Sequence, residues 1–90
     1  MKKVIITVIG KDTVGIIAKV CTYLADHNVN ILDISQTIVG GYFNMMMIAD
    51  TSTSNKTTEE VRHELHQIGQ EIGVDIHVQH EGIFEMMHRI

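Results

Sequence analysis

Four stretches of the chain have hydrophobic patterns that predict β-strands, either alternating with polar positions or apolar throughout. These stretches are residues 4–9, 29–39, 42–49 and 74–79. The first and third are apolar on both faces, as expected for strands in the centre of a sheet. The second is rich in β-branched residues, and its alternation slips between Ile31 and Leu32. We therefore expect a bulge or an edge position in that strand.

Two other stretches carry apolar residues at helical spacing. Between residues 14 and 28 these residues follow the spacing i, i+3, i+4, i+7, which predicts a helix with one buried face. The positions are Ile17, Val20, Cys21 and Leu24. A second amphipathic helix is predicted from the capping box Thr57-x-x-Glu60 to Gly73, a residue suited to a helix C-terminus. It would bury Val61, Leu65, Ile68 and Ile72.

The order of elements is β-α-β-β-α-β, followed by a tail, with Gly40-Gly41 as a hairpin signal. Short connections and right-handed crossovers then favour an α+β, ferredoxin-like fold. We expect a four-stranded antiparallel sheet with both helices on one face, the first and third strands central, and a short C-terminal helix. This divides the chain into a domain, residues 1–80, and an amphipathic tail, residues 81–90.

The two helices would cover only one face of the predicted sheet. The other face would carry four apolar side chains, and the tail carries four more at helical spacing. Those of the sheet are Ile5, Ile9, Met46 and Ile48, and those of the tail are Ile83, Met86, Met87 and Ile90. An uncovered apolar face of this size requires a partner surface. The candidates are the tail and a second subunit.

Composition narrows the classes of function. Ninety residues with 44% hydrophobic content make one small globular domain. A formal net charge of −4 argues against a nucleic-acid partner. The single cysteine cannot form an internal disulfide, which suits a reducing cytoplasm. The apolar run after Met1 is too short for a signal peptide, and no stretch is long enough to cross a membrane, so we expect a cytoplasmic protein without a membrane partner.

The loop between the first strand and the first helix is the candidate for chemistry. It reads Gly10-Lys11-Asp12-Thr13-Val14-Gly15. Glycine at each end permits a sharp turn and close approach of another group, and Asp12 or Thr13 could cap the helix. The free N–H groups of the helix start suit a small anionic or zwitterionic ligand. The alternative is a tight turn with no further role.

Together these features resemble the ACT domain family. The resemblance runs from about Val4 to Val78 and rests on three segments, residues 8–17, 29–31 and 43–47. The chain looks most like the small bacterial ACT proteins that stand alone, which are similar in turn to the ACT halves of glycine-cleavage repressors. The tail also looks typical of that stand-alone group.

The resemblance implies a regulatory dimer that binds a small molecule, usually an amino acid, between the loop of one subunit and the second strand of the next. Ligand-binding residues would then be Gly10, Lys11, Asp12, Thr13, Val14, Gly15 and Asn30. Asp12 stands at a polar contact position of the family, and Asn30 stands at its second-strand asparagine. Two positions depart from the pattern: Gly10 replaces the histidine of serine-binding members, and Val14 replaces a common proline.

The implied partners are a second copy of the chain, a small amino acid, and a regulated enzyme or transcription factor. A ligand-free module for protein interaction or dimerisation is the alternative.

We expect no catalytic residue, no metal and no cofactor. His63 and His66 share a helix face but lack convergent ligands. RNA recognition motifs have the same element order, yet Tyr42 and Phe43 face opposite sides, so only one could stack a base. Cys21 lies on the buried helix stripe, where a thiol is inert.

Overall fold

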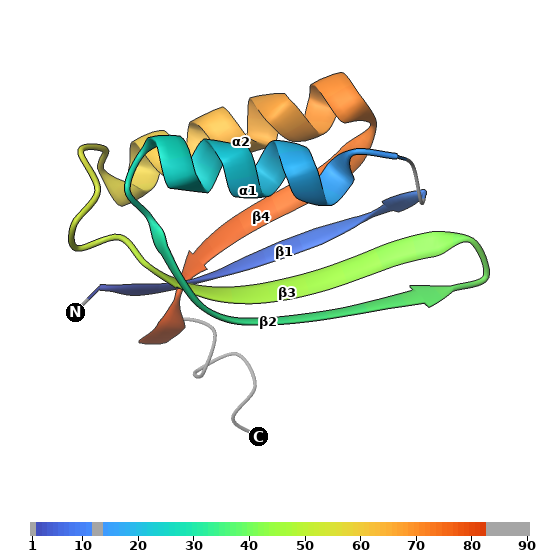
Figure 1. Ribbon diagram of the computed structural model, residues 1–90, viewed down its shortest axis with the longest axis horizontal. Coiled ribbons are helices and arrows are strands. Elements are labelled where there is room, and N and C mark those ends of the chain that lie inside the picture. Colours follow the sequence, from blue (N-terminus) through green and yellow to red (C-terminus); the bar gives the residue numbers. More distant parts are fainter. Residues whose placement is uncertain (1, 12–13, 83–90) are drawn as a thin grey trace.

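The computed structural model describes residues 2–11 and 14–82, and its element order is the predicted one (Figure 1). The elements are β1 (Lys3–Lys11), α1 (Ile16–Asp26), β2 (Asn30–Val39), β3 (Tyr42–Asp50), α2 (Thr58–Ile72) and β4 (Val74–His80). All strand pairs are antiparallel, in the order β2-β3-β1-β4. Both helices cover the same face of the sheet. The predicted ferredoxin-like fold is confirmed, while the predicted tail helix lies, from Ile83 onward, outside the described residues.

The predicted turn chemistry is also confirmed. Gly40 and Gly41 both have positive φ, 58° and 82°, as a two-residue hairpin turn requires. Thr57 and Glu60 form a complete capping box at the start of α2. Gly73 ends that helix in the left-handed conformation, with φ 79°. The register of β2 shifts between Ile31 and Asp33, which is the bulge expected in an edge strand.

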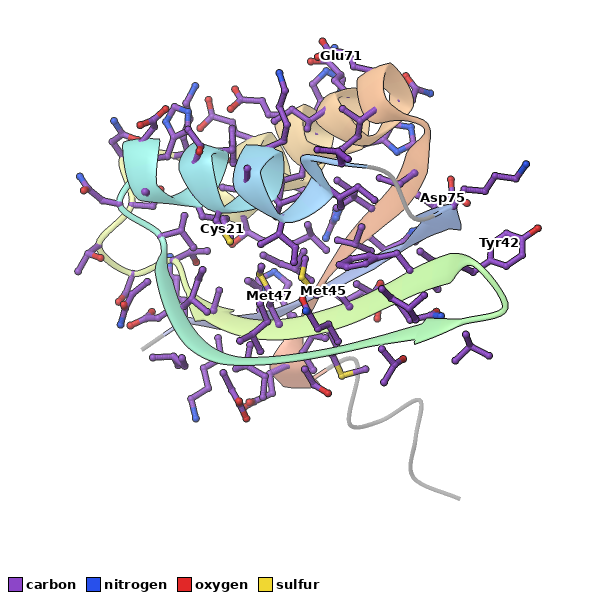
Figure 2. The ribbon with its side chains drawn as sticks, turned by 45° about the vertical axis from the view of Figure 1, so that its right-hand side comes forward. Cys21, Tyr42, Met45, Met47, Glu71 and Asp75 are labelled. Atoms are coloured by element: carbon purple, nitrogen blue, oxygen red, sulfur yellow. The ribbon has the colours of Figure 1, made fainter. Side chains whose placement is uncertain are left out.

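The core lies between the sheet and the two helices. Val4, Ile6 and Val8 of β1 are fully buried there. Figure 2 shows Met45 and Met47 of β3 pointing into the same layer. Methionine is flexible and polarisable, so it fills irregular gaps between a twisted sheet and its helices.

The buried stripe of α1 differs from the predicted one, which was Ile17, Val20, Cys21 and Leu24. Ile17 is 37% exposed, whereas Ile16 and Tyr23 are buried together with Val20 and Leu24. The helix begins at Ile16, so the stripe that meets the sheet runs from Ile16 through Val20 to Tyr23. Cys21 is partly buried and packs against the core, close to its predicted place.

A polar cluster joins α1 to α2 beside this core. The Tyr23 hydroxyl donates a hydrogen bond of 2.5 Å to Glu64, whose second carboxylate oxygen pairs with Lys56 Nζ at 2.9 Å. The Tyr23 and Lys56 hydrogen bonds hold the pKa of Glu64 below its ordinary value. Burial, reinforced by the Glu64 carboxylate, raises the pKa of Tyr23. The cluster therefore keeps a neutral phenol and an ionised carboxylate between the helices.

Two glycines allow α2, β4 and β1 to approach one another closely. A Cβ at Gly69 of α2 would lie 2.6 Å from the backbone oxygen of Val74. A Cβ at Gly10 of β1 would lie 2.6 Å from the Val74 Cγ1. Real Cβ atoms essentially never lie within 3.0 Å of another non-bonded heavy atom, so both positions favour glycine. The residue Val74 is thus enclosed by two glycines from different elements.

We predict that Gly69→Ala destabilises the protein by about 1–3 kcal/mol, because the added methyl group overpacks against the Val74 backbone. In an exposed helix the same change would stabilise by up to about 1 kcal/mol, so the sign is informative. Urea unfolding followed by circular dichroism measures it. Gln70→Ala, at the exposed neighbouring position, is the control and should change the free energy of unfolding by less than about 0.5 kcal/mol. A neutral or stabilising Gly69→Ala would contradict the close packing.

Candidate ligand-binding site

Among the described residues, none provides a side-chain cap at the start of α1. Gly15 holds the N-cap position with φ 93° and offers no side chain, and the first helical turn contains no acidic residue. The first helical hydrogen bond runs from the Lys19 N–H to the Gly15 carbonyl oxygen, at 2.9 Å. The N–H groups of residues 16–18 therefore have no partner within the helix. The prediction that Asp12 or Thr13 would cap this helix is wrong, because Gly15 occupies that position. Asp12 and Thr13 themselves lie outside the described residues.

The surroundings of Gly15 are open. Nothing lies within 4 Å of the place where a Gly15 Cβ would stand. Val14 and Ala18 on either side are exposed. The free N–H groups and the positive end of the helix dipole thus face an accessible surface, which is favourable for a carboxylate.

Gly10 and Lys11 lie at the end of β1, where the sheet meets the start of β4. They line a shallow hollow of about 400 Å³ together with Tyr42, Gly73 and Asp75. Figure 2 shows Tyr42 projecting from the β2–β3 hairpin and Asp75 near the same end of the sheet. The absence of a side chain at Gly10 is explained by its contact with Val74. Its part in a ligand site is therefore limited to its backbone.

Asn30 lies at the opposite end of the sheet from the loop. It pairs with Asp50, which in turn pairs with Lys3 at the beginning of β1. The loop follows Lys11, eight residues further along that strand, so the two parts of the predicted site are roughly 27 Å apart in one subunit. A single chain does not bring Asn30 to the Gly10–Gly15 loop.

Asn30 has polar neighbours that sequence reasoning did not single out. It lines a hollow of about 460 Å³ with Asn28 and Thr53, and the Thr53 hydroxyl donates to the Asn28 carbonyl at 3.1 Å. The nearby Asp50 carboxylate accepts hydrogen bonds from the backbone N–H groups of Ser52 and Lys2, and the Ser52 bond chiefly lowers the Asp50 pKa. Asp50 is therefore an anion at neutral pH. The pairing of β2 with β3 brings Asp50 to Asn30, and the contact between the 51–57 loop and the end of α1 adds Thr53.

Three histidines lie together, away from both parts of the predicted site. His63 and His66 of α2 and His77 of β4 line a groove of about 610 Å³. Within residues 2–11 and 14–82 no three histidine, cysteine or acidic side chains converge to hold a metal ion. In the same residues no helix is long and apolar enough to cross a membrane.

Comparison with known proteins identifies the family. The ACT domain model matches residues 2–79, so the chain belongs to the ACT domain family, whose members are generally regulatory, ligand-binding domains. A UPF0237 protein of Bifidobacterium longum is 60% identical over 90 residues, covering 100% of both chains. The solved ACT domain protein from Streptococcus pneumoniae has a TM-score of 0.81 and 40% identity over 93% of this chain and 94% of its own.

A more distant structure shares the fold. The putative glycine cleavage system transcriptional repressor has a TM-score of 0.76 at 22% identity, and it aligns with 88% of this chain and 45% of its own. The resemblance to the ACT family and to small stand-alone members is thereby confirmed. The assignment of ligand-binding residues in this chain therefore rests on the geometry of the α1 start and Asn30 described above.

We predict that Gly15→Ala lowers stability by about 1 kcal/mol although space is available for the methyl group, because only glycine adopts positive φ without strain. Gly15→Asn should cost less, since asparagine tolerates the left-handed region better than alanine. Denaturant unfolding of the two variants measures the difference. Val14→Ala, at the exposed adjacent position, serves as the control for a neutral change. Equal stability of Gly15→Ala and wild type would exclude the positive φ as the reason for glycine.

Proposed function

We propose that this chain is a non-catalytic regulatory domain that binds a small amino acid at the interface of a homodimer. The observation that carries the proposal is the separation of the two halves of the site, the α1 start and Asn30, at opposite ends of the sheet. A second copy is the simplest means of bringing the halves together. The protein that this regulatory domain controls would be an enzyme or a transcription factor.

The two edge strands of the sheet, β2 and β4, differ in how accessible they are for pairing with a strand of another chain. β2 is ten residues long, and every residue from Leu32 to Val39 is exposed, including Ile34 and Ile38. The edge of β4 is protected, since Arg62 of α2 donates from Nε to the Val78 carbonyl at 3.0 Å. A long, exposed, apolar edge strand is a template for pairing with another chain. We therefore assign the dimer contact to β2.

An antiparallel pairing of β2 with its copy would bring the two halves of the site to the same end of the extended sheet. Closed two-fold pairs dominate small homo-oligomers. In such a pair the beginning of one β2 lies beside the end of the other. Asn30 of the partner subunit would then approach Val39, which is paired through Tyr42 to Lys11 at the end of β1. The loop and the partner's Asn30 would thus share one end of the extended sheet.

The chemistry of this composite site suits a zwitterion. The free N–H groups of residues 16–18 would bind the α-carboxylate. The side chain of Asn30 offers both a donor and an acceptor. Asp12 is the proposed partner of the α-ammonium group, with Lys11, Thr13 and Val14 forming the remaining wall of the loop. No step of this scheme requires a catalytic group, a metal or a cofactor.

One observation favours the alternative, a protein-interaction module without ligand. Val14 is fully exposed, and Ile17 one turn further is also exposed. Two apolar side chains beside an uncapped helix start suit contact with another protein surface. The ligand screen below distinguishes the two proposals.

For the dimer, we predict that the wild-type chain elutes at about twice 10.1 kDa in light scattering at micromolar concentration. Ile34→Lys combined with Ile38→Lys should yield a monomer, because charges on an edge strand oppose pairing. His66→Lys, an exposed change on α2, is the control and should remain dimeric. A monomeric wild type, or a dimer that tolerates both lysines, would reject β2 as the interface.

For the ligand, we predict that one or more free amino acids raise the melting temperature. At a hundredfold excess over the dissociation constant the stabilisation is about 2.7 kcal/mol, which corresponds to roughly 10–20 °C for a domain of this size. Asn30→Ala should abolish this shift with little loss of basal stability, while Asn55→Ala in an exposed loop should retain it. A shift that survives Asn30→Ala together with Gly15→Val would place the ligand elsewhere. Absence of any shift would favour the interaction module.

A further inference from the structure

The face of the sheet away from the helices carries apolar side chains that the core does not use. Ile9 and Met46 on this face are 49% and 40% exposed. They line a small hollow of about 190 Å³ together with Thr7 and Asn44. We call this surface the open face.

Ile5 is the exception on the open face. Ile5 pairs with Ile48 of β3 and Gln79 of β4, and the residues on either side of Ile5 and of Ile48 belong to the core. Successive side chains of a strand point to opposite faces, so Ile5 points away from the helices. Yet Ile5 is only 5% exposed, and it does not belong to the core cluster between sheet and helices. Burial on this side indicates a cover near the beginning of β1.

The chain leaves β4 at that same place. His80, the last residue of β4, pairs with Val4. In the view of Figure 1 the helices lie above the sheet, and the short dark red segment that follows β4 lies below it, on the side of the open face. Lys2 and Lys3 line a hollow with Glu81 and Gly82. Gly82, the last described residue, therefore lies beside Lys2 and Lys3, at the beginning of the strand that carries Ile5.

We propose that residues 83–90 dock on the open face of their own sheet, running from Ile5 over Met46 toward Ile9. The segment has four apolar residues at helical spacing, Ile83, Met86, Met87 and Ile90. Eight residues in a helix span about 12 Å, and Ile5 and Ile9 are about 14 Å apart along an extended strand. Methionines on both surfaces adapt to one another's shape.

The segment's own sheet is a better acceptor than a second subunit. Side-by-side pairing through β2 extends the sheet and leaves the open face of each subunit uncovered. The segment starts beside β4, the edge opposite to β2 in the strand order, so the partner's open face is more than three strand spacings away, roughly 15 Å or more. The choice of the segment's own sheet over that of a second subunit rests on the proposed β2 dimer.

Disulfide trapping in the full chain tests the contact. In a Cys21→Ala background, Met46→Cys combined with Met87→Cys should form an intramolecular disulfide on mild oxidation. The matched control combines Ile38→Cys, on the helix side of β2, with the same Met87→Cys. Because a disulfide needs Cα atoms within about 7 Å, we expect the Met46 pair to close at least about tenfold faster. Equal rates, or a disulfide only between subunits, would overturn the proposal.

A second measurement does not depend on cysteine geometry. Met87→Asp should lower the melting temperature of the full chain by about 5 °C or more and increase binding of a dye that detects exposed apolar surface. His88→Asp adds a similar charge at the next position, off the apolar helix face, and should change the melting temperature by less than about 2 °C. Equal effects of the two substitutions would show that residues 83–90 do not bury this face on the sheet. Failure of the β2 dimer alone would leave both measurements unchanged.

Discussion

The burial of Val4, Ile6 and Val8 against both helices is the interaction on which the rest of the molecule depends. These side chains belong to β1, which pairs with β3 on one side and β4 on the other. Removing this strand would separate the sheet into two unconnected parts. Burying such side chains contributes about 1.5–3 kcal/mol each, so a domain of 90 residues relies heavily on this one strand.

The central strand also determines how close its neighbours lie. Gly10 in β1 and Gly69 in α2 both leave room for Val74, so β4 sits tightly between a strand and a helix. Arg62 then reaches over the outer side of β4 and bonds the Val78 carbonyl. As a result the β4 edge is protected, while the β2 edge, which contacts little of either helix, stays free for pairing. The difference between the edges follows from where the helices can pack, and it directs assembly to one side.

The same arrangement leaves two features accessible. One is the start of α1 at Gly15, which has no side-chain cap among the described residues. The other is the open face, where Ile9 and Met46 are exposed while Ile5 is buried. A regulatory domain has use for both, since one suits a small anionic group and the other suits an apolar segment. The start of α1 lies in the helical layer, and the open face is on the opposite side of the sheet.

Local patterns in the sequence determined the element order, the central position of β1 and β3, the Gly40-Gly41 hairpin and both ends of α2. These features depend on periodicity and turn chemistry within a few residues, so they can be predicted without the fold. The resemblance to the ACT family was recognisable for the same reason, because its segments are short and contiguous. Tertiary structure alone decided the rest. It placed Asn30 far from the Gly10–Gly15 loop, since strand register is a long-range property. It assigned Gly10 to packing against Val74, and it shifted the buried stripe of α1 from Ile17 to Ile16, because both depend on which atoms of other elements arrive at those positions.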